Sequence, residues 1–121
     1  MRNIKSFIYD RLGTDEVLKG MVAGIYPNAA PREAKSPVIV YNRIADEKTD
    51  IVCNSLYQIS VRSDDLEKAE STKNRVVWLF SRYKAEGIRC SIMGINETYD
   101  HESGDRWLHI TIKFKLVDPD F

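Results

Sequence analysis

The sequence predicts an α+β domain, in which a mostly antiparallel sheet of about four strands packs against one long helix and is preceded by N-terminal helices. Three observations predict this class. Apolar residues recur at helical spacing near the N-terminus and again between Ser63 and Gly87. Four further segments are β-branched runs or alternate apolar with polar residues. Short polar connections join these segments in pairs, which favours hairpins and an antiparallel sheet. The expected element order is α-α-β-β-α-β-β.

Length and charge limit what kind of protein this is. The 121 residues suit a single domain, 1–121, and 43% hydrophobic with 30% charged residues is typical of a soluble globular protein. The 18 basic and 18 acidic side chains cancel, so no basic excess favours nucleic acid as a partner. No apolar run reaches the roughly 18 residues of a membrane span, and Asp10 and Asp15 interrupt any signal-peptide core. We expect a cytoplasmic protein without a membrane partner.

Two helices are predicted before the first strand. In residues 2–12 one helical stripe holds four apolar residues: Ile4, Phe7, Ile8 and Leu12. Gly13 ends this helix. The Thr14 hydroxyl is expected to cap a short second helix, in which Asp15 and Glu16 lie near the positive end of the helix dipole.

A proline-rich arm and two strands follow. Three prolines lie between Pro27 and Pro37, and their fixed φ predicts an extended arm, ordered or mobile, that can reach outward. The apolar run Val38–Tyr41 predicts a strand covered on both faces. A charged turn is expected at Asp46–Asp50. From Cys53 to Arg62 apolar and polar residues alternate, which predicts a half-buried strand.

The longest helix is predicted after Ser63. Asp64 and Glu67 have the spacing of a capping box, and Gly87 is the expected stop. Its apolar face holds Leu66, Ala69, Val76, Phe80 and Tyr83. Trp78 falls on nearly the opposite side of the helix.

Two further strands are predicted at the end of the chain. In the first, which runs towards Tyr99, one side holds Ile88, Cys90 and Ile92. In the second, apolar and polar residues alternate from Leu108 to Leu116, and the polar face carries Trp107 and His109.

Catalytic, metal and cofactor sites are not indicated. Cys53, Cys90, His101 and His109 are scattered without the spacing of zinc ligands, and each cysteine is interpreted as a small buried hydrophobe. A cysteine–histidine pair is conceivable, but His109 is expected on the surface beside Trp107, and no nucleophile elbow is present. The six glycines form no phosphate-binding loop, and the acidic stretch 97–105 lacks the order of a calcium loop. We expect no enzyme activity, metal or cofactor.

The two tryptophans are the clearest candidates for an interaction site. Large aromatic residues outside a core act as anchors at protein interfaces, although other parts of the monomer could equally cover them. Two segments are expected to dock beside these anchors: the arm 27–37 and the loop 97–106. The candidate interface residues are Trp78, Trp107, His109, Pro27, Pro31, Arg32, Tyr99, Asp100, His101, Glu102, Asp105 and Arg106.

Three segments together resemble a known family. The first is Ile25-Tyr26-Pro27 with a Pro/Ala-rich stretch that closes at Ser36-Pro37 before the strand VIVYNRI; the others are YQISVRSDDLEKAESTKNRV and RWLHITIKFKLV. This pattern, which covers most of the chain, resembles the tail-completion proteins of long-tailed bacteriophages, also called tail terminators or tail-to-head joining proteins. No single motif is diagnostic.

The resemblance implies a structural role in the virion. Family members share an α+β fold and form a ring, generally hexameric, that caps the tail tube, stops its growth and presents a surface to the head connector. The implied partners are other copies of the chain, the tail tube protein and the connector, first in the host cytoplasm and then in the tail or neck. Alternatives are another neck protein, such as a head-completion component, or a small dimeric α+β enzyme or ligand-binding module.

Overall fold

The computed structural model describes residues 4–31, 33–48, 53–81, 83–85 and 87–116. The elements follow the chain as α1 (Ile4–Gly13), α2 (Glu16–Lys19), β1 (Gly24–Pro27), β2 (Val38–Lys48), β3 (Cys53–Ser63), α3 (Leu66–Phe80), β4 (Lys84–Ala85), β5 (Ile88–Tyr99) and β6 (Arg106–Leu116). The predicted α+β class, with one long helix, is confirmed. Among the described residues, no helix has the length and apolar composition that crossing a bilayer requires.

The strands form one six-stranded sheet in the order β1-β2-β3-β6-β5-β4. β1 runs parallel to β2, and every other neighbouring pair is antiparallel. The four strands predicted from the sequence are β2, β3, β5 and β6, which form the centre of the sheet. The residue pattern does not predict β1 and β4, because four and two residues are too few for a periodic pattern to stand out.

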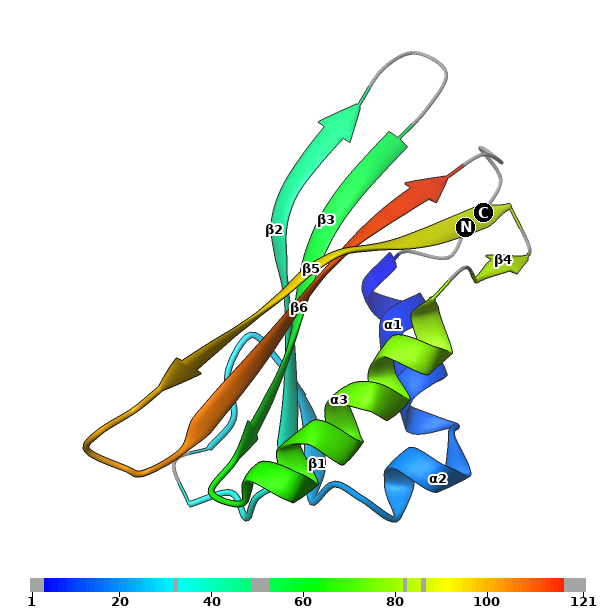
Figure 1. The fold of residues 1–121 in the computed structure, drawn as a ribbon. Coiled ribbons are helices and arrows are strands. Elements are labelled where there is room, and N and C mark those ends of the chain that lie inside the picture. Colours follow the sequence, from blue (N-terminus) through cyan, green and yellow to red (C-terminus); the bar gives the residue numbers. More distant parts are fainter. Residues whose placement is uncertain (1–3, 32, 49–52, 82, 86, 117–121) are drawn as a thin grey trace.

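The helices cover one face of the sheet and leave the other face without a helical layer (Figure 1). α3 crosses β3 and β6, and α1 and α2 pack beside it. The buried stripe of α1 is the predicted one: Ile4, Phe7, Ile8 and Leu12. Phe7, Phe80 and Phe114 meet edge to face, with ring centroids 5.9 to 6.4 Å apart. Each buried Phe contributes roughly 1.5–3 kcal/mol, so this cluster fixes the helices on the sheet.

The central strands also follow the prediction. Residues Val38–Tyr41 of β2 are all at most 5% exposed. Ile39 and Tyr41 belong to the core beneath the helices, whereas Val40 lines a groove on the other face. The inward side of β6 is buried at four alternate positions: Leu108, Ile110, Ile112 and Phe114.

The predicted start of α2 is wrong in its capping group. The Asp15 carboxylate, and not the Thr14 hydroxyl, caps the helix by accepting a hydrogen bond from the Leu18 amide at 2.9 Å. Thr14 Oγ1 donates instead to the Asp10 carbonyl at 2.6 Å. A carboxylate at this position also opposes the positive end of the helix dipole, which a hydroxyl cannot do.

Both predicted ends of α3 need correction. Its cap is Asp65, which accepts from the Lys68 amide at 3.2 Å, so the capping box of Asp64 and Glu67 does not form. The helix ends at Phe80, well before Gly87. Gly87 instead adopts a φ of 81° in the turn between β4 and β5, a conformation that costs glycine little.

Two further predictions about side-chain positions and turns are wrong. The charged turn expected at Asp46–Asp50 does not begin at Asp46, because β2 runs on to Lys48, which pairs with Cys53 of β3; residues 49–52 lie outside the described residues. Leu66 is 45% exposed, because it is the first residue of α3 and lies at the margin of the buried face. Thr72 and Leu79 complete that face instead.

Candidate functional site

Trp78 projects from the outer side of α3 and is 65% exposed, the largest exposure among the described large hydrophobic residues. Arg75 supports one face of its ring. The Arg75 guanidinium lies over one face of the Trp78 ring, 4.2 Å from its centroid, in a cation–π contact. Arg75 also donates two hydrogen bonds to the Asp15 carboxylate, from Nη2 at 2.7 Å and from Nε at 2.9 Å.

Asp15 connects this arrangement to the start of α2. Its carboxylate binds Arg75 and the Leu18 amide together, and the hydrogen bond from Arg75 lowers the pKa of Asp15 below 3.8. α2 and α3 are thereby joined directly below the indole. We call Trp78, Arg75 and Asp15 the tryptophan platform. An aromatic side chain fixed in this way loses little conformational freedom when a partner binds it.

Trp107 lies on the face of the sheet that carries no helices and is partly buried. Its ring stacks on His109, with centroids 5.9 Å apart and planes 6° apart. Arg62 lies 5.9 Å from its centroid on the neighbouring strand. These residues line an open groove of about 430 Å³, together with Ala29 and Ala30 of the arm. Trp107 and the arm thus border the same groove, and Trp107 is partly buried within the monomer, as one of the two interpretations of the sequence requires.

His109 is the centre of a polar network at the floor of this groove. Its Nδ1 lies 2.8 Å from Ser60 Oγ and 3.0 Å from Gln58 Nε2, and its Nε2 lies 2.9 Å from Thr98 Oγ1. Burial lowers the pKa of His109 below 6.5, so the imidazole is neutral at physiological pH. The expectation of a surface histidine is corrected: His109 lies beside Trp107 as predicted but is half-buried and held at both ring nitrogens.

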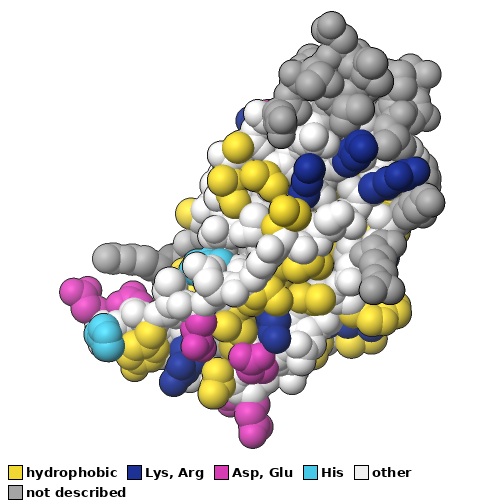
Figure 2. Space-filling model, turned by 45° about the horizontal axis from the view of Figure 1, so that its top comes forward, with side chains coloured by type: hydrophobic (Ala, Val, Ile, Leu, Met, Phe, Trp, Pro, Cys, Tyr) yellow, Lys and Arg dark blue, Asp and Glu magenta, His cyan; other side chains and the backbone are white. Residues whose placement is uncertain are grey.

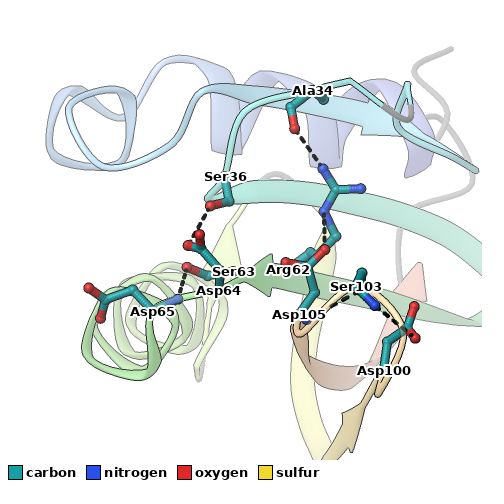
Figure 3. A network of polar contacts seen from close by, with 9 residues as sticks. All are labelled: Ala34, Ser36, Arg62, Ser63, Asp64, Asp65, Asp100, Ser103 and Asp105. Atoms are coloured by element: carbon teal, nitrogen blue, oxygen red, sulfur yellow. Dashed lines mark hydrogen bonds and ion pairs between the residues drawn. The ribbon is translucent and has the colours of Figure 1, made fainter.

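The arm between β1 and β2 is fastened to the sheet and does not extend outward (Figure 3). Arg62 Nη2 donates to the Ala34 carbonyl at 2.9 Å. Ser36 Oγ donates to Asp64 Oδ1 at 2.9 Å. Pro27 is the last residue of β1, and Pro31 is exposed. Arg32 lies outside the described residues.

The end of the β5–β6 hairpin is a tightly bonded turn. Asp100 Oδ1 accepts from the amides of Glu102 at 2.9 Å and Ser103 at 3.5 Å, which lowers the pKa of Asp100. Asp105 forms an ion pair with Arg62 at 3.8 Å (Figure 3). Arg62 therefore joins the arm to the hairpin end. The sequence pattern gives no sign that these two segments are connected.

Tyr99, His101 and Arg106 complete the hairpin end. Tyr99 is 47% exposed, and its ring lies 4.8 Å from the His101 ring. The Arg106 guanidinium lies over the Tyr99 ring, 5.3 Å from its centroid, and forms an ion pair with Glu97 at 3.4 Å. Glu97 and Tyr99 belong to β5, so the loop itself is shorter than the predicted segment 97–106.

Two kinds of catalytic group can be examined among the described residues, namely a cysteine nucleophile and a set of metal ligands. Burial raises the pKa of the Cys90 thiol to about 12, so it stays protonated and is a poor nucleophile. Cys90 is 4% exposed, which confirms the prediction of a buried hydrophobe for this residue; the side chain of Cys53 lies outside the description. Within the described ranges, no three side chains among His, Cys, Asp and Glu are grouped as metal ligands.

The structure brings some predicted residues together and separates others. Trp107 and His109 share the groove, whereas Trp78 lies on the opposite, helical side of the sheet. Sequence reasoning missed Arg62 and Ser60, although their place on the polar side of β3 was predicted and register sets them opposite Trp107 and His109. It also missed Asp15 and Arg75, which are 60 residues apart and give no local signal.

Comparison with known proteins shows a likeness at the level of the fold. No protein-family model matches the sequence, and no curated protein matches it. Among solved structures, a chain in the "Virion of native gene transfer agent (GTA) particle" is similar over 95% of both chains, with a TM-score of 0.75 and 13% sequence identity. The two chains therefore have the same fold.

Proposed function

We propose that this chain is a structural protein of a tailed-phage-like virion, and that its copies form a closed ring that ends the tail tube and joins it to the head connector. The ring is hexameric by resemblance to the tail-completion family. The tail tube protein and the connector are its partners, and the virion tail or neck is its location. The chain acts by shape and contact and not by catalysis.

The observation that carries this proposal is the similarity of fold to a virion chain across 95% of both sequences. Since a shared fold at 13% identity does not by itself carry function, a second line of support matters. The sequence pattern independently resembles a family whose members also belong to virions. The two lines of support use different information, namely backbone geometry and residue pattern.

The candidate interaction surfaces suit a ring. A closed ring needs a head-to-tail interface, in which two different patches on each subunit are complementary. The tryptophan platform lies on the helical side of the sheet, and the groove beside Trp107 lies on the other side. An exposed indole on one side and a groove of about 430 Å³ on the other are such a pair of different patches.

The first test is the mass of the native protein by light scattering across a wide concentration range. We expect a hexamer. A stable dimer that does not bind purified tail tubes would contradict the proposal. If the protein is a monomer in solution, the second experiment is co-sedimentation with tail tubes that lack their terminator, because a ring can require the tube as a template. Binding to DNA-filled heads but not to tubes would instead identify the chain as a head-completion protein.

A small ligand-binding module is the second candidate, and the groove favours it. The groove has the size of a small-molecule site and contains Gln58, Ser60 and Arg62. However, these polar groups already bond to one another, to His109 or to the arm, so they leave few free donors for a ligand. A dimer that binds a small molecule in this groove would favour this candidate over the ring.

A further inference from the structure

A group of basic side chains lies at one end of the sheet face that has no helices. Arg89 of β5 and Lys115 of β6 are exposed and directly opposite each other in the strand register. Lys113 lies two residues before Lys115 on the same face of β6. Like charges directly opposite each other on neighbouring strands destabilise a sheet. In the part of the chain that the structure describes, none of the three takes part in an ion pair.

The opposite end of the same two strands is acidic. Residues 97–106 contain four acidic residues and one arginine. Arg62 pairs with Asp105, and Arg106 pairs with Glu97. Within the described part of the chain, neither Asp100 nor Glu102 forms an ion pair. Both are exposed. Figure 2 shows a group of Lys and Arg side chains near one end of the visible face and its Asp and Glu side chains near the other end.

The two charged ends cannot neutralise each other within one molecule. Lys115 lies nine positions after Arg106 along β6, which in a strand is roughly 30 Å. This exceeds the screening length of about 8 Å at physiological salt. Among the described residues, nothing therefore recovers the cost of placing Arg89 opposite Lys115, and local features that oppose folding are expected where a protein binds a partner.

We propose that the basic patch, defined as Arg89, Lys113 and Lys115, binds the acidic hairpin end of a second copy of this chain. The inference deepens the proposed ring and rests on it. The two ends have opposite charge, and they lie at opposite ends of the same hairpin, so each copy offers one end to each neighbour. Such a contact is head-to-tail, as ring closure requires. The hairpin end is also preorganised, because two backbone hydrogen bonds, Asp100 to Asp105 and Gly104 to Asp100, close its turn, and the Asp100 carboxylate accepts a third from the Glu102 amide.

The test is a pair of charge reversals with a compensating combination. Lys115→Glu alone and Glu102→Lys alone are each expected to weaken self-association by about tenfold or more at low salt. The double variant with both changes restores an opposite-charge pair and is expected to recover most of that loss. Lys68→Glu is the matched control, because it makes the same charge change at an exposed position of α3. Association is measured by light scattering, and circular dichroism checks that each variant is folded.

Three outcomes would overturn the inference. In the first, the single reversals leave association unchanged, or the control weakens it equally. In the second, the double variant recovers nothing. In the third, wild-type protein stays monomeric at low salt while Lys115→Glu abolishes retention on duplex DNA, which would assign the patch to nucleic acid. The proposed function is decided separately by tail-tube binding: a ring that forms and caps tubes, yet ignores these reversals, keeps that function and rejects only this contact.

Discussion

At the scale of single residues, a few side chains bind several parts of the molecule at once. Asp15 caps α2 and pairs with Arg75, and Arg75 in turn supports the Trp78 ring. Each contact is modest, but removing one member leaves a partner without its hydrogen bond, which costs more than the contact itself contributes. The consequences of single substitutions therefore depend on how many partners each side chain has.

Trp78→Ala is expected to leave the folded monomer intact and to weaken self-association or tail binding. The indole is 65% exposed and contributes little to the core, so the free energy of unfolding should change by less than about 0.5 kcal/mol. Leu66→Ala is the control, because Leu66 is an exposed apolar residue of the same helix. Thermal unfolding and light scattering measure the two effects. Unfolding of the Trp78→Ala monomer would show that this tryptophan belongs to the core.

Trp107→Ala is expected to weaken assembly as well, but with some loss of stability. Trp107 is partly buried and stacks on His109, so its removal opens space on the sheet face. We expect a loss of about 1 kcal/mol, in the ordinary range for a partly buried side chain. Denaturant titration of the monomer separates this loss from any change in assembly. Complete unfolding of the isolated domain would place Trp107 in the structural core and remove it from the interface.

Asp15→Ala is expected to reduce the free energy of unfolding by about 1 kcal/mol or more, because both the helix cap and the partner of Arg75 are lost. Asp15→Asn keeps a capping oxygen and should lose less. The pKa of Asp15 is lowered in the folded state, so its contribution is present above the unfolded value near 3.8 and disappears as pH falls through the folded value. Denaturant titrations at neutral and acidic pH measure this. Equal losses for Ala and Asn, independent of pH, would contradict the assignment.

At the scale of elements, Arg62 connects pieces that lie far apart in the sequence. From β3 it contacts the Ala34 carbonyl of the arm, Asp105 of the hairpin end and the Trp107 ring. One side chain thus sets the position of the arm against the groove and of the hairpin end against the sheet. The docking elements of the proposed interface are therefore coupled through a residue that does not itself project outward.

Arg62→Met is expected to release the arm while preserving the apolar part of the side chain. Amide hydrogen exchange of residues 33–36 and 100–105 should accelerate by about fivefold or more, since a hydrogen bond to a charged group contributes roughly 1.5–3 kcal/mol. The Val22 amide, which donates to the Leu18 carbonyl outside the arm, serves as the internal control. Unchanged exchange throughout the arm would show that Ser36 and the backbone are sufficient to hold it.

At the scale of the whole molecule, the sheet divides two different surfaces. The helical side carries the tryptophan platform, and the other side carries the groove and, at its far end, the basic patch. A protein with a net charge of zero can still be electrically asymmetric, with its charges sorted along one hairpin. Different surfaces on two sides suit a ring of identical subunits better than a symmetric dimer.

The sequence by itself determined the four long strands, the helix α1 with its buried stripe, the existence of α3 and the place of Trp78 off the apolar face of that helix, whereas its exposure was left open. These features depend on periodicity, which is local: an apolar stripe forms a helix face wherever that helix packs. The polar sides of β3 and β6 were also readable from alternation, so Trp107 and His109 could be placed on a common face.

Only the tertiary structure decided what these residues touch. The short strands β1 and β4 exist because neighbouring strands supply their hydrogen bonds, and the arm lies on the sheet because Arg62 and Asp64 hold it there. The bond between Asp15 and Arg75 spans 60 residues, and the opposition of Arg89 to Lys115 depends on the register of two strands. Contacts between distant segments depend on how the chain packs as a whole, which no local pattern encodes.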